Sequence, residues 1–367
     1  MKILQVIARV NRGGTAVWLE NLILGLRANG FECILAAGHV QGSEIEDECF
    51  ANLNGVRIKS MGRDLSIFGD IRSFLQVRSL IVELKPDVLN SHTAKAGVIA
   101  RVASISIPKR NRPAIVHTYH GHLLYGYFPT WKVKIYIAIE RILASRTNRL
   151  IAAGVKVRNE LLQVKVGNIN KYSVINPGVR KIKGIDRKLL RADIGLRDNQ
   201  IVVGWLGRFT PVKRPEYFLE LAKHFPEVTF IMGGDGELFS KISNAMSSNV
   251  LLLGWTTPEK IWGLSDIAVL TSKNEAQPIS LVEAQFLSLP IVSFDVGSVS
   301  EIVEHGVSGY LVDDFSSLKI YIEKLLESKE LRLSFGSAGQ KHALANHGIS
   351  NFISKHIETY KNAGHGS

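Results

Sequence analysis

The sequence predicts an α/β protein made of two doubly wound domains. Buried strand-like runs alternate with helical segments along the chain, and a second alternation begins near residue 201 after a charged, loosely patterned segment. Strands that alternate with helices form parallel sheets covered by helices on both faces. At 367 residues the chain is also longer than one ordinary core requires, so two domains are expected.

The first domain is expected to span residues 1–178. It ends at Asn176-Pro177-Gly178, a turn signal that follows the last strand of the first alternation. The strands of this domain are expected at residues 2–8, 31–37, 87–90, 114–118, 149–153 and 172–175, and its helices at residues 16–28, 44–53, 71–84, 94–104 and 131–148.

The second domain is expected to span residues 179–345. Residues 346–367 are expected to form a helix that packs back toward the first domain, followed by a flexible tail from residue 363. The strands of the second domain are expected at residues 201–206, 228–232, 250–253, 266–270, 291–294 and 310–312.

The composition is typical of a globular protein, with 46% hydrophobic and 21% charged residues. Cys33 and Cys49 lack the spacing of a metal site or a redox pair, which indicates a reducing compartment. The N-terminal apolar run is too short for a signal peptide, and no window reaches the roughly 18 apolar residues of a spanning helix. We therefore expect a cytoplasmic protein. The net charge of +12 indicates an anionic partner, such as nucleic acid, acidic lipid or a phosphorylated substrate.

Residues 274–290, NEAQPISLVEAQFLSLP, carry the most informative motif. Glu275 and Glu283 lie on either side of a predicted loop-to-helix junction, and Pro278 suits the first turn of that helix. A helix N-terminus attracts anions and hydroxyl-bearing ligands, and carboxylates accept hydrogen bonds from sugar hydroxyls. The motif therefore favours a nucleotide sugar as ligand. The free N–H groups expected at the helix start belong to Ile279, Ser280 and Leu281.

A basic loop follows the predicted strand at residues 201–206. Gly207 lets the backbone approach a ligand, and Arg208 and Lys213 place two cations beyond the strand end. Fixed cations stabilise the charge that develops on a diphosphate leaving group, although a solvated basic loop has the same pattern. Gly254-Trp255, after a later strand, offers a surface for a base or a ribose.

The first domain offers two candidate contacts at the ends of its strands. Gly13-Gly14 separates the first strand from a helix start, which fits a phosphate cradle but is more often an ordinary tight turn. His120 belongs to the run HTYHGH at residues 117–122, where we expect one histidine to bind a hydroxyl or position an acceptor. The three histidines are also compatible with a metal ion, but no carboxylate or cysteine lies at ligand spacing, so no metal site is expected.

Residues 131–148 form a basic amphipathic helix with aromatic flanks. Such helices lie on anionic membranes, and a solvated helix face is the alternative interpretation. Further basic residues in the same half of the chain are Lys109, Arg110 and Arg112.

Together these residues resemble those of a known family. Gly207, Arg208 and Lys213, then Glu275 and Glu283 in NEAQPISLVEA, and then DVGSVSEIVEHGVSGYLV are similar to the retaining glycosyltransferases of family 4. These enzymes have the GT-B fold, in which two Rossmann-like domains face each other across a cleft. The motifs SHTAKAG and HTYHGH and the first glycine pair extend the resemblance over nearly the whole chain.

The resemblance implies roles for the candidate residues of the second domain. Glu283 would bind the ribose of the donor, and Glu275 would contact the transferred sugar beside the N–H groups at residues 279–281. Arg208 and Lys213 would hold the diphosphate. The implied reaction retains the anomeric configuration and uses neither a metal ion nor another cofactor.

The resemblance also implies roles in the first domain. Gly14 would approach the diphosphate, and His120 would face the reacting sugar. Thr15-Ala16 stands where the family often has an acidic residue. Any donor or acceptor contact that the acidic residue makes is therefore in doubt for this chain. The other departures from the family pattern, none of which removes a charge from the expected donor site, are Ala276, Ser298 and Ser300.

The implied function is transfer of a hexose-type sugar from a nucleoside diphosphate donor, with UDP favoured over GDP, to a saccharide or lipid-linked saccharide in cell-envelope polysaccharide assembly. The basic first domain would then face the inner membrane surface. One alternative is a sugar-nucleotide epimerase of GT-B shape, although no base that removes a proton from a sugar carbon is evident. The other is a non-catalytic basic protein that binds nucleotides or nucleic acid, although neither exposed stacking aromatics nor a recognition helix is evident. We therefore expect no nucleic-acid partner.

Overall fold

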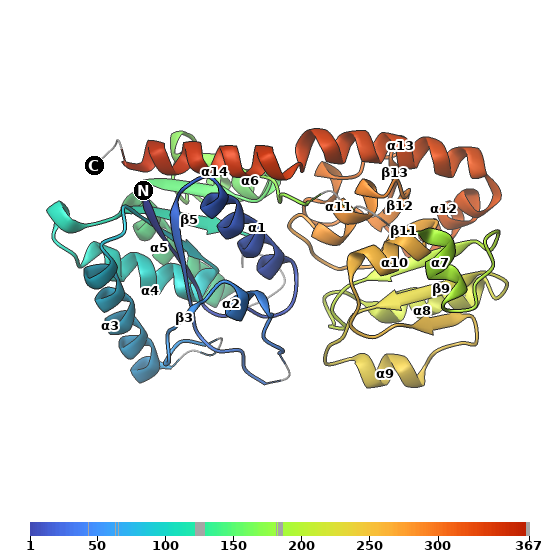
Figure 1. The fold of residues 1–367 in the computed structure, drawn as a ribbon, viewed down its shortest axis with the longest axis horizontal. Helices are drawn as coiled ribbons and strands as arrows, with labels where there is room; N and C mark the ends of the chain where they lie inside the picture. The colour runs from blue at the N-terminus through green and yellow to red at the C-terminus, as the bar shows by residue number, and fades with distance from the viewer. Residues whose placement is uncertain are drawn as a thin grey trace. The chain divides into compact units, whose positions relative to one another are not determined.

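The computed structural model describes residues 1–42, 44–62, 64, 66–121, 129–180, 182 and 186–364. The chain forms two compact units: unit 1 comprises Met1–Gly178 and the segment from Ile349 onward, and unit 2 comprises Val179–Gly348. Each unit contains one parallel β-sheet with helices packed against it (Figure 1). The predicted fold class of two doubly wound α/β domains is confirmed.

The sheet of unit 1 has seven strands in the order β3-β2-β1-β4-β5-β6-β7. The strand order reverses between β1 and β4, and ligands of such sheets bind beyond the carboxyl ends of the strands at that point. The strands are β1 (Lys2–Ile7), β2 (Glu32–Ala37), β3 (Val56–Arg57), β4 (Val88–His92), β5 (Ala114–Tyr119), β6 (Arg149–Ala152) and β7 (Tyr172–Val174). The helices are α1 (Gly14–Ala28), α2 (Cys49–Asn52), α3 (Ile67–Leu84), α4 (Ala94–Ile105), α5 (Thr130–Ser145), α6 (Val155–Gln163) and α14 (Ile349–Gly364).

The last helix, α14, completes unit 1 by packing along α1 (Figure 1). Phe352, Ile353 and Tyr360 recur at helical spacing and join the apolar core that the sheet shares with α1. The Tyr360 hydroxyl is fully buried and accepts hydrogen bonds from the side-chain amides of Gln5 at 3.1 Å and Asn90 at 2.8 Å. Because those amides belong to β1 and β4, α14 is fixed against the two strands where the order reverses.

Unit 2 is built around a six-stranded sheet in the order β10-β9-β8-β11-β12-β13. The strands are β8 (Val202–Leu206), β9 (Thr229–Gly233), β10 (Val250–Leu252), β11 (Ile267–Leu270), β12 (Ile291–Phe294) and β13 (Gly309–Val312). The helices are α7 (Arg187–Ala192), α8 (Pro215–His224), α9 (Phe239–Asn244), α10 (Pro258–Leu264), α11 (Ile279–Phe286), α12 (Phe315–Glu327) and α13 (Lys329–Asn346).

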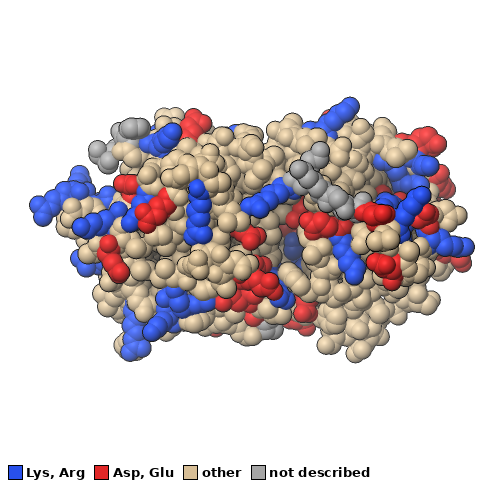
Figure 2. Space-filling view, in the orientation of Figure 1, with Lys and Arg blue, Asp and Glu red and all other residues tan. Residues whose placement is uncertain are grey.

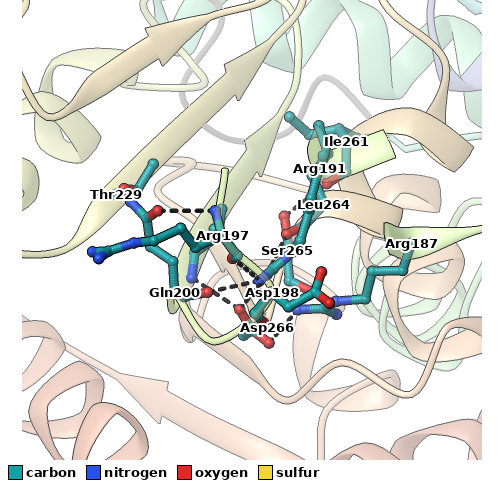
Figure 3. Close-up of polar contacts among 11 residues, drawn as sticks. Arg187, Arg191, Arg197, Asp198, Gln200, Thr229, Ile261, Leu264, Ser265 and Asp266 are labelled. Atoms are coloured by element: carbon teal, nitrogen blue, oxygen red, sulfur yellow. Dashed lines mark hydrogen bonds and ion pairs between the residues drawn. The ribbon is translucent and has the colours of Figure 1, made fainter. Parts of the chain in front are cut away.

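A polar network around the buried Arg191 side chain anchors the amino ends of the two central strands of unit 2 (Figure 3). Arg191 of α7 is 1% exposed and donates to the Leu264 carbonyl at 2.9 Å and to Oδ2 of Asp266 at 2.7 Å. Asp266 also pairs with Arg187 and accepts from the Val202 N–H at 2.9 Å. The network therefore holds the start of β8 beside the start of β11, so that the loops at their opposite ends also lie side by side.

The structure corrects several predicted boundaries. β4 continues through Ser91 and His92, and β5 continues through Tyr119, although these residues were expected in loops. Polar residues are tolerated there because their side chains are hydrogen-bonded inside the unit, as for the Ser91 hydroxyl and the His117 ring at 2.8 Å. The helix predicted at residues 44–53 is only the single turn α2, and β3 was not predicted.

The ends of other elements also differ. α3 begins at Ile67, four residues before the predicted start, because the Ser66 side chain caps it by accepting from the Gly69 N–H. α14 extends through Gly364, so residues 363 and 364 are helical, and residues 365–367 of the expected tail lie outside the described residues. No helix of the described residues has the length and apolar content to cross a membrane.

Candidate functional site

Lys213 and Glu275 form an ion pair between the loops that follow β8 and β11. These strands are neighbours in the sheet, so their loops meet at its carboxyl edge. The Lys213 ammonium and the Ser272 hydroxyl, the latter at 2.5 Å, both donate to Oε1 of Glu275. The side chains of Lys213 and Glu275 are only 19% and 10% exposed. The structure thus brings together two predicted site residues that are 62 positions apart in the chain.

Arg214, which was not predicted as a site residue from the sequence, fixes the position of Lys213. Its guanidinium donates to the carbonyls of Thr271 at 2.8 Å and Ser272 at 2.9 Å, which tethers the loop after β8 to the loop after β11. The Thr271 hydroxyl in turn donates to the Lys213 carbonyl at 2.8 Å and accepts from the Trp205 indole at 3.0 Å. Arg214 adopts a φ of +47°, which a non-glycine residue holds only where its surroundings impose it.

The loops after β8, β9 and β10 are in close backbone contact. The Gly234 N–H donates to the Gly254 carbonyl at 2.7 Å, and a Cβ on Gly234 would lie 1.9 Å from the Gly207 carbonyl oxygen. Trp255, which follows Gly254, is 48% exposed. Arg208 lies in the loop after β8 and is half-buried. The candidate binding residues in the loops after these three strands therefore lie at the same edge of the unit 2 sheet.

The start of α11 differs from the prediction. Pro278 is the residue before the helix rather than part of its first turn, and its carbonyl accepts from the Leu281 N–H at 3.1 Å. The Leu281 N–H is therefore engaged and was wrongly expected to be free. The N–H groups of Ile279 and Ser280 make no backbone hydrogen bond within the described residues, and they remain the donors at the helix start.

Glu283 lies on α11 and is only 7% exposed. Burial raises the pKa of its carboxyl to about 8, with a smaller contribution from the nearby Glu259 carboxylate. The group therefore holds a proton in the free unit at neutral pH. Hydroxyl groups that donate hydrogen bonds to this carboxyl would favour its ionised form.

The segment after β12 clamps the backbone of Glu275. Gly297 has a φ of +55°, and a Cβ at this position would lie 1.6 Å from the Glu275 carbonyl oxygen. The Ser298 N–H donates to the same oxygen at 3.3 Å and to the Ala276 carbonyl at 3.2 Å. Sequence reasoning noted Ser298 only as a departure from a family pattern and missed the clamp. The Asp-Val-Gly turn signal was visible, but its contact with a loop 22 residues earlier was not.

In unit 1, His120 follows β5 and lies against α1. Its Nε2 is 2.8 Å from Nδ1 of His92, and its ring packs edge-on against Trp18 with centroids 4.9 Å apart. The other nitrogen of His92 is 2.8 Å from the Gln5 side-chain oxygen. Burial, with a smaller contribution from His356, lowers the pKa of His120 to about 3, so its imidazole is neutral at physiological pH.

The glycine pair forms the start of α1. Gly13 precedes the helix with a φ of +141°, and its carbonyl accepts from the Ala16 N–H at 3.0 Å. Gly14 is exposed as the first residue of the helix. Since α1 also carries Trp18, the structure places the helix start and His120 in the same part of unit 1.

Residues 122–128 of the histidine-rich segment lie outside the described residues, among them the third predicted histidine, His122. Within the described ranges, no group of three or more histidine, cysteine or carboxylate side chains is arranged to hold a metal ion.

Two family models match the chain. Residues 12–181 match glycosyltransferase family 4, and residues 186–342 match glycosyl transferases group 1. A relative from Escherichia coli, UDP-Gal:alpha-D-GlcNAc-diphosphoundecaprenol alpha-1,3-galactosyltransferase, is 28% identical over 299 residues, which are 75% of this chain and 76% of the relative. The Staphylococcus aureus capsular polysaccharide biosynthesis glycosyltransferase CapM is 24% identical and aligns over 82% of this chain and 83% of its own length.

Solved structures share the fold at low sequence identity. Anabaena Alr3699/HepE in complex with UDP and glucose is 22% identical, with a TM-score of 0.81 over 98% of this chain and 99% of that one. Sucrose-phosphate synthase from Thermosynechococcus elongatus is 14% identical, with a TM-score of 0.84 over all of both chains.

Proposed function

We propose a function from the family: the chain belongs to the family 4 glycosyltransferases, which have the GT-B fold. It transfers a hexose-type sugar from a nucleoside diphosphate sugar to a saccharide or lipid-linked saccharide. UDP is the preferred nucleotide of the donor over GDP. The setting is the assembly of a cell-envelope polysaccharide. The observation that carries the proposal is the ion pair of Lys213 with Glu275 at the carboxyl edge of unit 2. A half-buried cation beside a carboxylate suits a ligand with an anionic diphosphate on one side and sugar hydroxyls on the other.

The donor lies along this edge of unit 2. Lys213 and Arg208 bind the diphosphate, and Glu275 contacts the sugar together with the N–H groups of Ile279 and Ser280. Glu283 binds the ribose hydroxyls, and the backbone at Gly254 with the exposed Trp255 borders the nucleoside. Support comes from the relative whose name includes UDP-Gal and from the structural neighbour in complex with UDP and glucose.

The transfer breaks the bond between the anomeric carbon and the diphosphate oxygen and forms a bond to the acceptor hydroxyl on the same face of the sugar. The acceptor proton passes to the leaving diphosphate, whose growing negative charge Lys213 and Arg208 stabilise without a metal ion. In unit 1, Gly14 and His120, whose imidazole is neutral at physiological pH, are the proposed candidate residues for this reaction. This course retains the anomeric configuration.

The proposed location is the cytoplasmic face of the cell membrane, where lipid-linked acceptors are available. Support comes from the name of the Escherichia coli relative, which acts on a diphosphoundecaprenol-linked sugar, and from the net charge of +12.

Two measurements test the proposal. In a thermal-shift panel of UDP, GDP and ADP, UDP is expected to raise the unfolding temperature of the protein most strongly. UDP-sugars with a membrane extract are then expected to yield free UDP and a glycosylated product with retained configuration, in the presence of a chelator as in its absence. No stabilisation by any nucleoside diphosphate, or formation of a free epimerised UDP-sugar without transfer, overturns the proposal.

A further inference from the structure

Helix α5 carries its apolar stripe on the outside of unit 1. Trp131, Ile135, Ile139 and Ile142 are 61%, 53%, 38% and 66% exposed. At about 100° per residue their side chains fall within an arc of roughly 80° around the helix. Amphipathic helices of globular proteins normally turn such a stripe toward the core, so this exposed stripe is unusual.

Cations border the stripe on both sides. At the same helical pitch, Lys132 lies on one flank, and Lys134 and Arg141 lie on the other, each within roughly 100° of the stripe. All three side chains are exposed. The Lys132 ammonium also lies 5.4 Å from the centre of the Trp131 ring. An aromatic and aliphatic stripe between basic flanks is typical of a helix that lies in a membrane interface.

The one carboxylate of α5, Glu140, is withdrawn from this surface. It is fully buried on the opposite side of the helix, where it pairs with the fully buried Arg101 of α4 at 2.6 Å. The Tyr119 hydroxyl donates to its second oxygen, also at 2.6 Å. The exposed side of α5 therefore carries no carboxylate. The buried pair also fixes the rotation of the helix, because turning the stripe inward would expose Glu140.

Helix α3 carries a second exposed stripe. Its exposed apolar residues fall within an arc of roughly 100°, which also contains the exposed Arg78. The Asp70 carboxylate at its border is paired with Lys95 at 2.6 Å, and the exposed Glu83 lies roughly 110° from the centre of the stripe. The stripe consists of Ile67, Phe68, Ile71, Leu75 and Val82, which are 79%, 79%, 54%, 55% and 52% exposed.

The two stripes belong to one side of unit 1. α3 and α5 both pack against α4 (Figure 1), and right-handed crossovers place the three helices on the same face of the sheet. The turn between α4 and β5 adds exposed Lys109 and Arg110. Figure 2 shows lysine and arginine side chains gathered over this turn at the left edge of the view.

We propose that the α3/α5 face, defined by the nine apolar residues of the two stripes, docks unit 1 on an anionic phospholipid bilayer. The apolar side chains enter the interface between head groups and acyl chains, and the flanking cations contact the lipid phosphates. Charge complementarity selects this occupant, because a second copy of the chain would set like charges against each other. The inference deepens the proposed membrane location, and its test does not depend on sugar transfer.

Flotation of the full chain with vesicles tests the proposal. The protein is expected to float with vesicles of phosphatidylglycerol and phosphatidylcholine at low ionic strength, less at high ionic strength, and not with phosphatidylcholine alone. Changing Trp131, Ile135 and Ile142 together to serine is expected to lower the partition coefficient at least about tenfold. The matched control changes three similarly exposed apolar residues of unit 2, Ile320, Leu333 and Leu344, to serine and is expected to float like the wild type.

A second measurement places Trp131 in the bilayer. Brominated lipids are expected to quench the fluorescence of the wild type but not that of Trp131→Phe. UDP-induced thermal stabilisation of the same variants reports on the donor site separately and is expected to remain unchanged. Failure of the wild type to float with anionic vesicles at low ionic strength overturns the proposal. Unchanged flotation of the serine variant also overturns it, as does a concentration-dependent dimer that this variant abolishes.

Discussion

Replacing Lys213 with alanine is expected to lower kcat for sugar transfer by about 100- to 1000-fold. The side chain is 19% exposed, and its ammonium pairs with Glu275, so it is held where the diphosphate of the donor would bind. Two unit charges about 4 Å apart at an effective dielectric constant of about 20 interact by about 4 kcal/mol. Removal of one preorganised charge-stabilising donor commonly costs 10²- to 10³-fold in kcat, which agrees with this figure.

The loss of Lys213 is expected to affect turnover more than folding. Glu275 keeps the hydrogen bond from the Ser272 hydroxyl at 2.5 Å, so the free energy of unfolding is expected to fall by only about 1–3 kcal/mol. Urea unfolding of the variant checks that it is folded at the assay temperature. Lys213→Arg keeps the charge but changes its geometry, and it is expected to recover part of the activity.

The assay measures release of the nucleoside diphosphate and formation of the glycosylated product. Lys223→Ala is the matched control, because Lys223 is 55% exposed and its nitrogen lies 3.9 Å from Glu220 on the surface of α8. A folded Lys213→Ala variant with kcat within about threefold of the control would refute the assignment of Lys213 to the leaving group.

Three further predictions concern pH, stability and the backbone clamp. Since burial raises the pKa of Glu283 to about 8, the folded protein keeps a proton that the unfolded chain releases. The free energy of unfolding is therefore expected to fall by up to about 4 kcal/mol as the pH rises toward 8. Urea titrations of Glu283→Gln are expected to lack this dependence on pH. Glu140→Ala is expected to cost about 3–5 kcal/mol in urea unfolding, because its guanidinium partner is fully buried, and a loss below about 1 kcal/mol contradicts this. Gly297→Ala is expected to weaken UDP binding at least about tenfold, because its Cβ would meet the Glu275 carbonyl at 1.6 Å. The control is Gly306→Ala, at a position with a φ of +78° and open space around it, and calorimetry is expected to show that it binds UDP like the wild type.

The sequence was sufficient to predict the fold class, because strand and helix periodicities are local. It also indicated polar and charged residues after the central strands. It did not predict which loops meet, since β8 and β11 are adjacent in the sheet but separated in the chain by β9 and β10. The pairing of Lys213 with Glu275 depends on that strand order.

Periodicity alone also could not predict that the apolar stripes of α3 and α5 are exposed. The spacing of Trp131, Ile135, Ile139 and Ile142 predicts one apolar face but does not tell whether that face is turned to the core or to the surroundings. The buried partner of Glu140 decides the orientation, and that partner, Arg101, comes from another helix. Long-range electrostatics of this kind leave no periodic trace in the sequence.

The return of α14 to unit 1 has a consequence for how the chain folds during synthesis. Unit 2 is one continuous segment, Val179–Gly348, whereas unit 1 needs Phe352, Ile353 and Tyr360 to complete its apolar core. Domains generally fold as units during synthesis, in the order in which their residues emerge from the ribosome. The strands of unit 1 are made first but keep an uncovered apolar face until α14 has left the ribosome, so the unit made second is the first to finish folding. During that interval the nascent chain is most exposed to aggregation and to capture by chaperones.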